Sequence, residues 1–505
     1  MRFIDRVLAP RKLLVIVVTI FIVCFIGSVA FKRTLPLPTS ISDVDIQNFR
    51  DSIPSYFKSD KSDCDVTKSA EHAAEEETFN STYTHARGIY ANGYETSYVP
   101  GTEDVFLMIK TGATVLWQRF PIHIATTLPQ LPHFAVYSDA PDVVAGIPVI
   151  DILADTKPAT KASDQFETWR QQQALLNEHA NIEISQAGIT GGWHLDKYKN
   201  LPMVAHGYKA YPTAKWYIFM DADTYILWPN MMRWLSTLNS EDLLYMGSVT
   251  YLGGKTPFVH GGSGVVMSGA LIRKTFGQEP DLGSQYESYA KVHCCGDHIL
   301  SHAFRDRNVI PVLTGDGYPF VSWRFQGGYH GDLQAEPPIT VRFSKLNWCE
   351  EIVTFHHLTA HDIEQLYEFE QKFSRDQPIL FKDVYHEFIM PYLRGGRQNN
   401  WDNQADIRVY SNDPEADPKN AQQKVYESYE SCSDACNQWE DCMMFRYRPG
   451  YCGLSDEIRL GKKHVDGDDS YSSFWRLDRI RAVRNGSGCD PVDALPEEGE
   501  FFRQR

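Results

Sequence analysis

The sequence predicts an α/β fold, in which a mostly parallel sheet is flanked by helices and followed by a small disulfide-stabilised domain. In the first two thirds of the chain, apolar segments typical of buried strands alternate with segments of helical spacing. Four cysteines crowd into 21 residues near the C-terminus. A chain of 505 residues exceeds one ordinary hydrophobic core, so we expect two folded domains.

The alternation of expected strands and helices sets the topology of the first domain. Strands that alternate with helices need crossover connections, which favour a parallel sheet. The segments are the strands 104–110, 134–139 and 216–220 and the helices 166–179 and 201–211. The polar stretch 395–404 is the expected boundary to the second domain.

The composition is that of a globular protein and excludes global disorder, with 43% hydrophobic and 13% aromatic residues. The formal net charge is -16. Nucleic-acid binding through phosphates needs a basic face, so we expect no nucleic-acid partner.

The N-terminus predicts a membrane anchor. Residues 13–31 form a run of 19 uncharged residues, close to the ~20 that a helix needs to cross a membrane. Basic residues dominate the preceding tail, 1–12, which the positive-inside rule places in the cytosol. The alternative is a signal peptide cleaved near Ser28-Val29-Ala30, although the apolar run is longer than the usual signal core. We expect an uncleaved type II anchor and then a polar stem over 32–100.

Sequons and cysteines agree with a lumenal location for the rest of the chain. Asn80 and Asn485 each begin a glycosylation sequon. Nine of the ten cysteines follow the apolar run, and this odd number leaves at least one thiol free or bridged to another chain. The clustered cysteines predict a disulfide framework whose three possible pairings stay open: Cys432, Cys436, Cys442 and Cys452.

The strongest chemical signal is the pair Asp221 and Asp223, directly after the apolar segment 216–220. Ligands of a parallel sheet collect at the carboxyl ends of its strands, where these acids are expected. Two carboxylates there can hold Mn²⁺ or Mg²⁺, which neutralises the charge on a departing diphosphate. The structural alternative is a chance Asp-x-Asp in a turn.

Three later segments carry further candidate residues, each with a structural alternative. Gly261 and Gly262 allow close approach to a sugar or phosphate, or form a plain turn before a strand. Asp297 is a candidate general base, or an N-cap. His356 and His357 end an expected strand, where side chains alternate, so only one of them is expected to face a site as a metal ligand. The alternative is a buried structural histidine.

In order along the chain, these segments resemble the Fringe and core-1 β1,3-galactosyltransferase group, glycosyltransferase family 31. The similarity covers roughly residues 100–395 and includes Ser138-Asp139, Leu195–Leu201 and Trp348-Cys349. The resemblance implies a GT-A fold for 101–395, a UDP-sugar donor, usually Mn²⁺, and inversion at the anomeric carbon. The adjacent Cys294 and Cys295 look more like the fungal branch of the family.

Roles carry over from the resemblance by position. Asp221, Asp223 and His356 match the metal ligands, and Asp297 matches the catalytic base. Ala222 departs from the family, which often has a third acid there. The residues implied for nucleotide-sugar binding are Asp139, Lys197, Asp221, Ala222, Asp223, Gly261 and Gly262.

The segment 405–480 resembles a PAN/apple domain, followed by a tail over 481–505. The matching features are the four clustered cysteines, Tyr426–Tyr429 and Phe445-Arg446-Tyr447. The resemblance implies a helix with two of the cysteines, stapled to strands with the other two. Such domains bind carbohydrate or protein; the alternative is a disulfide-stabilised appendage.

Together these features predict an inverting, metal-dependent glycosyltransferase of the Golgi or endoplasmic reticulum membrane. It would transfer a hexose or HexNAc from a UDP-sugar to a lumenal glycan or glycoprotein, with a β1,3 linkage expected. One alternative is a GT-A enzyme of another linkage type, including a retaining one. The other is a catalytically idle lumenal scaffold, which the intact set of acids and histidine argues against.

Overall fold

The computed structural model describes residues 84–85, 98–178, 183–252, 256–309, 338–413, 423–463 and 470–489. The chain divides into two compact units, Met1–Thr78 and Phe79–Arg505, and all described residues belong to the second. The expected cytosolic tail, anchor and nearly all of the stem, together with Asn80, lie outside the described residues. Among the described helices, none is both long and apolar enough to cross a membrane.

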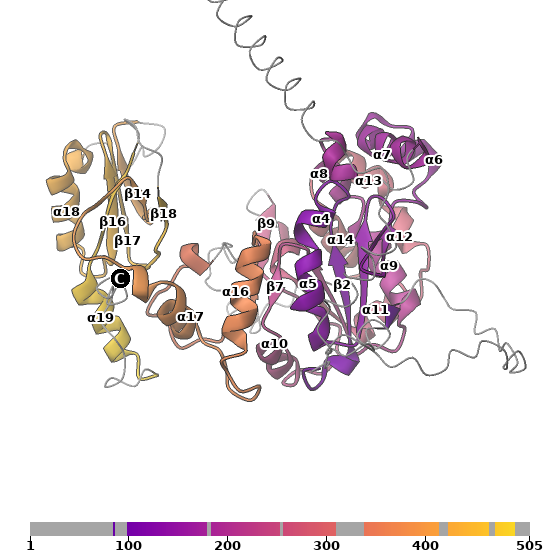
Figure 1. Ribbon diagram of the computed structural model, residues 1–505, viewed down its shortest axis with the longest axis horizontal. Coiled ribbons are helices and arrows are strands. Elements are labelled where there is room, and N and C mark those ends of the chain that lie inside the picture. Colours follow the sequence, from indigo (N-terminus) through magenta and orange to yellow (C-terminus); the bar gives the residue numbers. More distant parts are fainter. Residues whose placement is uncertain are drawn as a thin grey trace, which may run out of the picture. The chain divides into compact units, whose positions relative to one another are not determined.

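The centre of the region before residue 310 is a mixed sheet with the strand order β4-β5-β3-β2-β6-β11-β8 (Figure 1). Its middle strands β5, β3, β2 and β6 are parallel, while β4, β11 and β8 pair antiparallel. The short β1 (Thr84–His85) pairs with the start of β3. The other bounds are β2 Val105–Lys110, β3 His133–Ser138, β4 Asp142–Val144, β5 Ile147–Asp151, β6 Trp216–Asp221, β8 Tyr245–Met246 and β11 Val265–Ser268. The expected α/β class is confirmed, and the architecture is consistent with the GT-A fold.

Helices cover both faces of this sheet, which explains why its strands read as continuous apolar runs (Figure 1). Alternate residues of β2 point to opposite faces, so Leu107 packs with the cluster that includes α10 and Met108 with the cluster that includes α9 and α14. The helices are α4 Leu116–Arg119, α5 Pro121–Ala125, α6 Pro158–Lys161, α7 Glu167–Glu178, α8 Trp193–Asp196, α9 Asn200–Ala210, α10 Trp228–Leu235, α11 Gly269–Lys274, α12 Leu282–Gln285, α13 Glu287–Val292, α14 Gly296–Arg305, α16 Ala360–Glu370, α17 Phe381–Phe388, α18 Tyr429–Gln438 and α19 Leu477–Gly486. The expected strands and the two expected helices match β2, β3, β6, α7 and α9 within two residues.

Two small antiparallel pairs lie outside this sheet. β7 (Tyr225–Ile226) pairs with β12 (Thr354–Phe355), so the chain beyond residue 338 returns beside the end of β6. β9 (Val249–Leu252) pairs with β10 (Thr256–Val259) ahead of the Gly261–Ser263 turn. The first pair matters most for the site, because it fixes where His356 lies.

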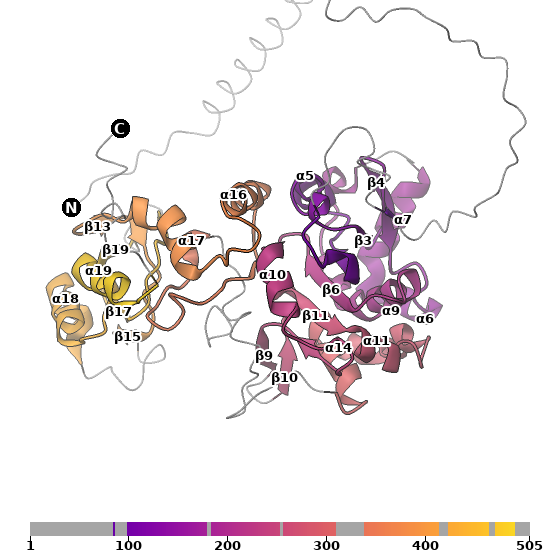
Figure 2. The same cartoon turned by 90° about the horizontal axis from the view of Figure 1, so that it is seen from below.

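The C-terminal part is a five-stranded antiparallel sheet with α18 and α19 beside it (Figure 2). Its order is β13-β19-β16-β17-β15, and a further pair joins β14 and β18. The bounds are β13 Gln398–Asn399, β14 Trp401–Asp402, β15 Arg408–Ser411, β16 Met444–Arg448, β17 Tyr451–Ser455, β18 Lys462–Lys463 and β19 Ser472–Trp475. The stretch 395–404, expected as a boundary, thus supplies two strands to C-terminal sheets, and α19 runs past residue 480. The exposed Asn485 lies near the end of α19.

The structure shows one of the three disulfide pairings that the sequence left open for the clustered cysteines. Cys432 of α18 bonds to Cys452 of β17, and Cys436 bonds to Cys442, which lies just before β16. Two further disulfides were not foreseen. Cys294 bonds to its neighbour Cys295, and Cys349 bonds to Cys489 across 140 residues.

Candidate active site

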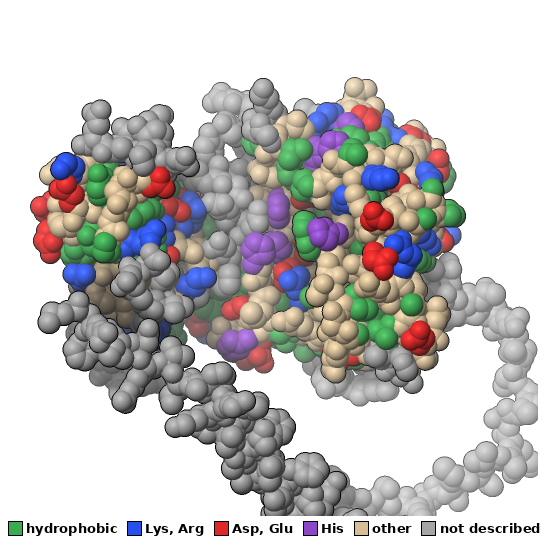
Figure 3. Space-filling model, turned by 90° about the horizontal axis from the view of Figure 1, so that it is seen from above, with side chains coloured by type: hydrophobic (Ala, Val, Ile, Leu, Met, Phe, Trp, Pro, Cys, Tyr) green, Lys and Arg blue, Asp and Glu red, His purple; other side chains and the backbone are tan. Residues whose placement is uncertain are grey.

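One cavity of about 690 Å³ lies at the carboxyl ends of β2 and β6. It is also lined by the Gly261–Ser263 turn, the start of α14 and the residues after β12. Histidine, acidic and basic side chains gather on this face of the molecule (Figure 3). The expected site residues that line the cavity are Lys197, Asp221, Asp223, Gly261, Gly262, Asp297 and His356. Among these residues, Lys197 and His356 are the farthest apart in the sequence, separated by 159 positions, and both line the same cavity.

Asp221, Asp223 and His356 form a cluster that fits a divalent cation. His356 Nε2 lies 3.3 Å from Asp223 Oδ1 and 3.7 Å from Asp221 Oδ2. One ligand atom from each residue lies within 4.8 Å of the others. Two carboxylate oxygens and an imidazole nitrogen suit Mn²⁺ or Mg²⁺, so the donor set fits the expected metal.

Both histidines after β12 line the cavity, but only His356 belongs to the cluster of possible metal ligands. β12 ends at Phe355, and His357 has a φ of 53°, in the left-handed region. The alternation of an extended strand no longer applies there. The two imidazole rings lie 4.0 Å apart, with His356 buried and His357 exposed.

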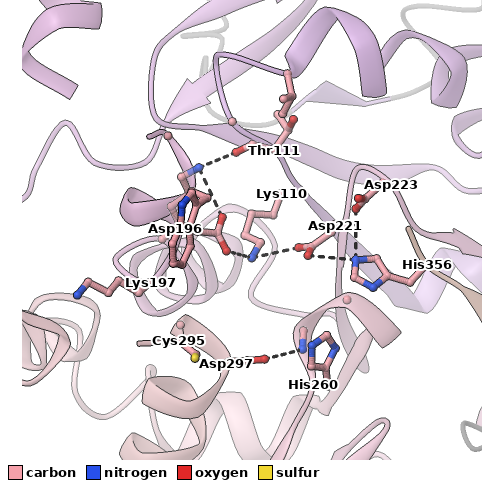
Figure 4. Close-up of a pocket in the computed structure, with 18 of the residues that line it drawn as sticks. Lys110, Thr111, Asp196, Lys197, Asp221, Asp223, His260, Cys295, Asp297 and His356 are labelled. Atoms are coloured by element: carbon pink, nitrogen blue, oxygen red, sulfur yellow. Dashed lines mark hydrogen bonds and ion pairs between the residues drawn. The ribbon is translucent and has the colours of Figure 1, made fainter. Parts of the chain in front are cut away.

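A buried lysine offsets part of the negative charge of the acidic pair. Lys110, at the end of β2, lies beside Asp221 in the parallel register, with Nζ 3.1 Å from Asp221 Oδ1, and also bonds to Asp196 (Figure 4). Burial opposes the charged form of Lys110, but the carboxylates of Asp196 and Asp221 raise its pKa above the ordinary value. On the other side, Arg119 Nη1 lies 3.1 Å from Asp223 Oδ2.

The charges of the cluster are mutually stabilised. Burial favours the neutral carboxyl of Asp221, but the ammonium of Lys110 and the imidazole of His356 lower its pKa below the ordinary value. Burial likewise opposes the imidazolium of His356, yet hydrogen bonds and charges from Asp221 and Asp223 raise its pKa to about 9. A cation that uses the His356 imidazole as a ligand needs its neutral form, so metal binding there competes with protonation.

His123 holds the turn between the two acids in place. Its Nε2 lies 3.0 Å from the Ala222 carbonyl oxygen, and its Nδ1 lies 2.8 Å from Thr127 Oγ1. Burial lowers the pKa of His123 to about 4, so the imidazole is neutral, and its Nε2–H donates to the carbonyl. The side chain of Ala222 is buried in the apolar core and does not line the cavity. An acidic side chain at this position would enter the same apolar cluster.

Gly262 and Gly261 serve different purposes. A Cβ on Gly262 would lie 2.0 Å from His356 Cε1, so only glycine lets the imidazole lie against this backbone. Gly261 donates its N–H to Asp297 Oδ2 at 3.0 Å, and a Cβ there would meet Phe219 at 3.4 Å. The glycine pair thus joins the metal cluster to the candidate base.

Asp297 lies in the first turn of α14, whose N-cap is Cys295, so Asp297 is not the N-cap of this helix. Its Oδ1 accepts the N–H of His298 at 2.7 Å, and Oδ2 accepts that of Gly261. Two amides therefore fix the carboxylate at the cavity wall, next to Cys295 and across from Lys110 (Figure 4). The remaining lone pairs are available to a hydroxyl that enters the cavity.

Asp139 and Lys197 differ in position. Asp139 does not line the cavity; it is fully buried and accepts from Lys199 Nζ at 2.9 Å, Gln172 Nε2 at 2.7 Å and the Ala113 N–H at 3.0 Å. It positions Lys199, which lines the cavity. Lys197 reaches the cavity, and its Nζ donates to the His293 carbonyl at 3.1 Å.

Only some of the cavity residues that the sequence analysis did not name carry a recognisable signal. Lys110 is a charged residue that closes a buried strand at the same sheet edge as Asp221, and Asp196 directly precedes Lys197. Arg119 and Trp193 stand in no motif, and only the tertiary structure brings them to the cavity.

Comparison with protein families matches residues 101–312 to the model described as Fringe-like. The matched segment carries both acids of the Asp-x-Asp motif, the glycine pair and Asp297, but ends before His356. No match was found among curated proteins. The family match supports a Fringe-like glycosyltransferase; the fungal branch and the PAN/apple resemblance stay predictions.

Proposed function

We propose that the protein is an inverting, metal-dependent glycosyltransferase that uses a UDP-sugar. It would transfer a hexose or HexNAc to a lumenal glycan or glycoprotein, with a β1,3 linkage as the expected product. The observation that carries the proposal is the meeting of the Asp221, Asp223 and His356 cluster with Asp297 in one cavity, inside a region that matches the Fringe-like family.

Two walls of the cavity would have different roles in the reaction. A divalent cation held by Asp221, Asp223 and His356 would supply positive charge to the diphosphate oxygens of the donor. Asp297 would take the proton of the acceptor hydroxyl as its oxygen bonds to the anomeric carbon. The bond from that carbon to the diphosphate breaks in the same step, and attack from the face opposite the leaving group inverts the configuration.

The charged side chains around the cluster support the same assignment. Lys110 and Arg119 flank the two acids. Their positive charges offset the repulsion between the acidic pair and a nucleotide diphosphate. Lys199, held by Asp139, adds a further ammonium group, which donates to the Thr111 carbonyl at 2.8 Å.

The test compares two variants of the full-length protein. We expect Asp223→Ala to abolish Mn²⁺-dependent UDP binding, measured by calorimetry, because it removes a ligand. Asp297→Asn should keep that binding and lose at least ~100-fold in transfer rate, the usual scale for a general base. A screen of UDP-Gal, UDP-GlcNAc, UDP-GalNAc and UDP-Glc identifies the donor.

Each part of the proposal fails on a different result. An α-linked product would exclude inversion, and full transferase activity of Asp297→Asn would exclude Asp297 as the base. Complete absence of metal-dependent UDP binding by the wild-type protein would favour the scaffold alternative.

The lumenal Golgi or endoplasmic reticulum location is part of the proposal and rests on residues 13–31 and the sequons. Asn485 is exposed, as a glycosylated side chain must be. Removal of N-glycans from the cellular protein should lower its apparent mass, and Asn485→Gln should remove part of that change. An unglycosylated protein would contradict the lumenal assignment.

A further inference from the structure

The Cys294–Cys295 disulfide joins two neighbouring residues at the wall of the cavity. Both cysteines line the cavity, and Cys294 is exposed whereas Cys295 is half-buried. Thiol–disulfide exchange needs a sulfur atom that an incoming thiolate can reach. The cysteines of the two C-terminal disulfides, in contrast, are fully buried: Cys432, Cys436, Cys442 and Cys452. The neighbouring pair is therefore open to attack by a small thiol from the cavity.

Cys295 is the N-cap of α14, and its side chain does not cap the helix in the usual way. Its carbonyl oxygen accepts the N–H of Ile299 at 3.1 Å, which begins the helical hydrogen bonding. In α14 as described, the side chain makes no capping hydrogen bond. Such a bond is made at the N-caps of α11, α16 and α18 by Ser268, Thr359 and Ser428. The disulfide therefore restrains a helix start that lacks a side-chain cap.

The residues on either side of the pair are already held in place. The His293 carbonyl accepts from Lys197 Nζ at 3.1 Å. A Cβ on Gly296 would lie 3.0 Å from Asn200 Cγ and 3.1 Å from the Asp196 carbonyl oxygen, so Gly296 packs closely against its neighbours. Two non-bonded sulfur atoms need more room than two bonded ones. The change on reduction therefore falls on the two cysteines, one of which is the N-cap.

Asp297 depends on the start of α14 for its position. It lies in the first turn of the helix, and its Oδ2 accepts the N–H of Gly261 at 3.0 Å. This bond joins two segments, so it needs the first turn in place. The candidate metal site comes instead from β6 and from the residues after β12. Loosening of the first turn would therefore displace the candidate base and leave the metal site as it is.

We infer that the Cys294–Cys295 disulfide is a redox switch that controls the position of Asp297. The intact bond holds the N-cap of α14 and thereby the carboxylate, which lies next to Cys295 (Figure 4). Reduction of the pair to two thiols by a dithiol releases the first turn. The effect on sugar transfer rests on the proposed function, whereas the change in α14 does not depend on it.

The reduction is a two-step thiol–disulfide exchange. A thiolate of the dithiol attacks Cys294 Sγ and forms a mixed disulfide, and Cys295 leaves as a thiolate that takes a proton. The second thiol of the dithiol then attacks the mixed disulfide, and Cys294 leaves as a thiolate and is protonated. The dithiol ends as a disulfide, so two electrons and two protons pass to the cysteine pair.

The experiment treats the full-length protein with dithiothreitol and follows the pair and the helix separately. Alkylation and mass spectrometry should find Cys294 and Cys295 reduced while the four buried cysteines stay bonded. Hydrogen–deuterium exchange at the first turn of α14 should become about fivefold faster, as for the loss of an N-cap. After removal of the dithiothreitol, sugar transfer should be at least about tenfold slower, with unchanged Mn²⁺-dependent UDP affinity.

Two double variants serve as controls. Cys294→Ala with Cys295→Ala should exchange like the reduced wild type, with or without dithiothreitol. Cys349→Ser with Cys489→Ser removes the other disulfide that has an exposed cysteine, and it should keep the response of α14.

The inference is overturned if the pair resists reduction in the folded protein, or if its reduction leaves exchange in α14 or the transfer rate unchanged. Loss of the response in the Cys349 and Cys489 variant would also overturn it, because the effect would then belong to the other disulfide. Absence of UDP binding in the oxidised wild type would defeat the proposed function instead, and hydrogen exchange would still decide whether the disulfide holds α14.

Discussion

At the scale of single residues, the backbone of Gly262 and the imidazole of His356 approach more closely than any side chain on residue 262 would allow. The imidazole carries one nitrogen of the candidate metal site, and the glycine before Gly262 carries the amide that donates to Asp297. The same three-residue turn therefore positions both halves of the proposed chemistry, and a change of one methyl group there tests it.

Gly262→Ala should displace His356 and weaken Mn²⁺-dependent UDP binding by at least about tenfold, because the new Cβ would occupy the position of the ring. Calorimetric titration of Mn²⁺ and UDP measures this, and circular dichroism checks that the variant is folded. Gly261→Ala is the matched comparison, since its Cβ meets only ordinary contacts, and it should lose less. Equal losses in both variants would show that the imidazole is not held by Gly262.

At the scale of elements, the last residue of α16 is a buried acid that links three segments. Glu370 is 3% exposed, bonds to Tyr225 of β7 and accepts from Gln130 Nε2 at 3.3 Å. Burial raises the pKa of Glu370 to about 7, although these hydrogen bonds oppose the rise. The helix is thereby tied to the short strand that follows the Asp-x-Asp turn.

This acid makes stability depend on pH with a definite sign. The folded state binds the Glu370 proton more tightly than the unfolded state, whose pKa is near 4.5. The stabilisation is full below that value and is lost as the pH rises through about 7, with a loss of ~3 kcal/mol at ~1.4 kcal/mol per pKa unit. Urea unfolding at pH 5 and pH 8 measures the difference for wild type and Glu370→Gln. A pH dependence that is the same in Glu370→Gln would contradict this origin.

At the scale of the whole described region, the Cys349–Cys489 disulfide joins the segment before β12 to the residues after α19. A buried core also spans these segments, with residues of α16, α17, β19 and α19 in one cluster. The segments before residue 395 and the C-terminal sheet therefore share one buried cluster, and the exposed residues 394–397 connect them along the chain.

Replacing both Cys349 and Cys489 by serine should destabilise the protein by ~3–5 kcal/mol, because the disulfide closes a loop of 140 residues in the unfolded chain. Cys349 is exposed, so the substitution removes little packing. Denaturant unfolding of the oxidised proteins measures the change. Unchanged stability in the double variant would show that the bond does not constrain the unfolded chain.

Features that depend on a local pattern could be predicted from the sequence alone. The apolar strand before Asp221, the glycine pair and the placement of Asp297 near a helix start are visible within ten residues each, because backbone geometry and strand alternation leave short-range signals. We predicted that these residues belong to one site from their order along the chain. The prediction also used the rule that ligands gather at the carboxyl ends of parallel strands.

Contacts between distant segments could be known only from the tertiary structure. Lys110 beside Asp221, His123 under the Asp-x-Asp turn and the pairing of β12 with β7 arise from packing across 99 residues or more, and no local pattern shows that these residues meet. The same holds for the disulfide pairing and for Trp193, which lines the cavity. Local propensity sets elements and motifs, whereas burial and charge balance between elements decide which side chains meet.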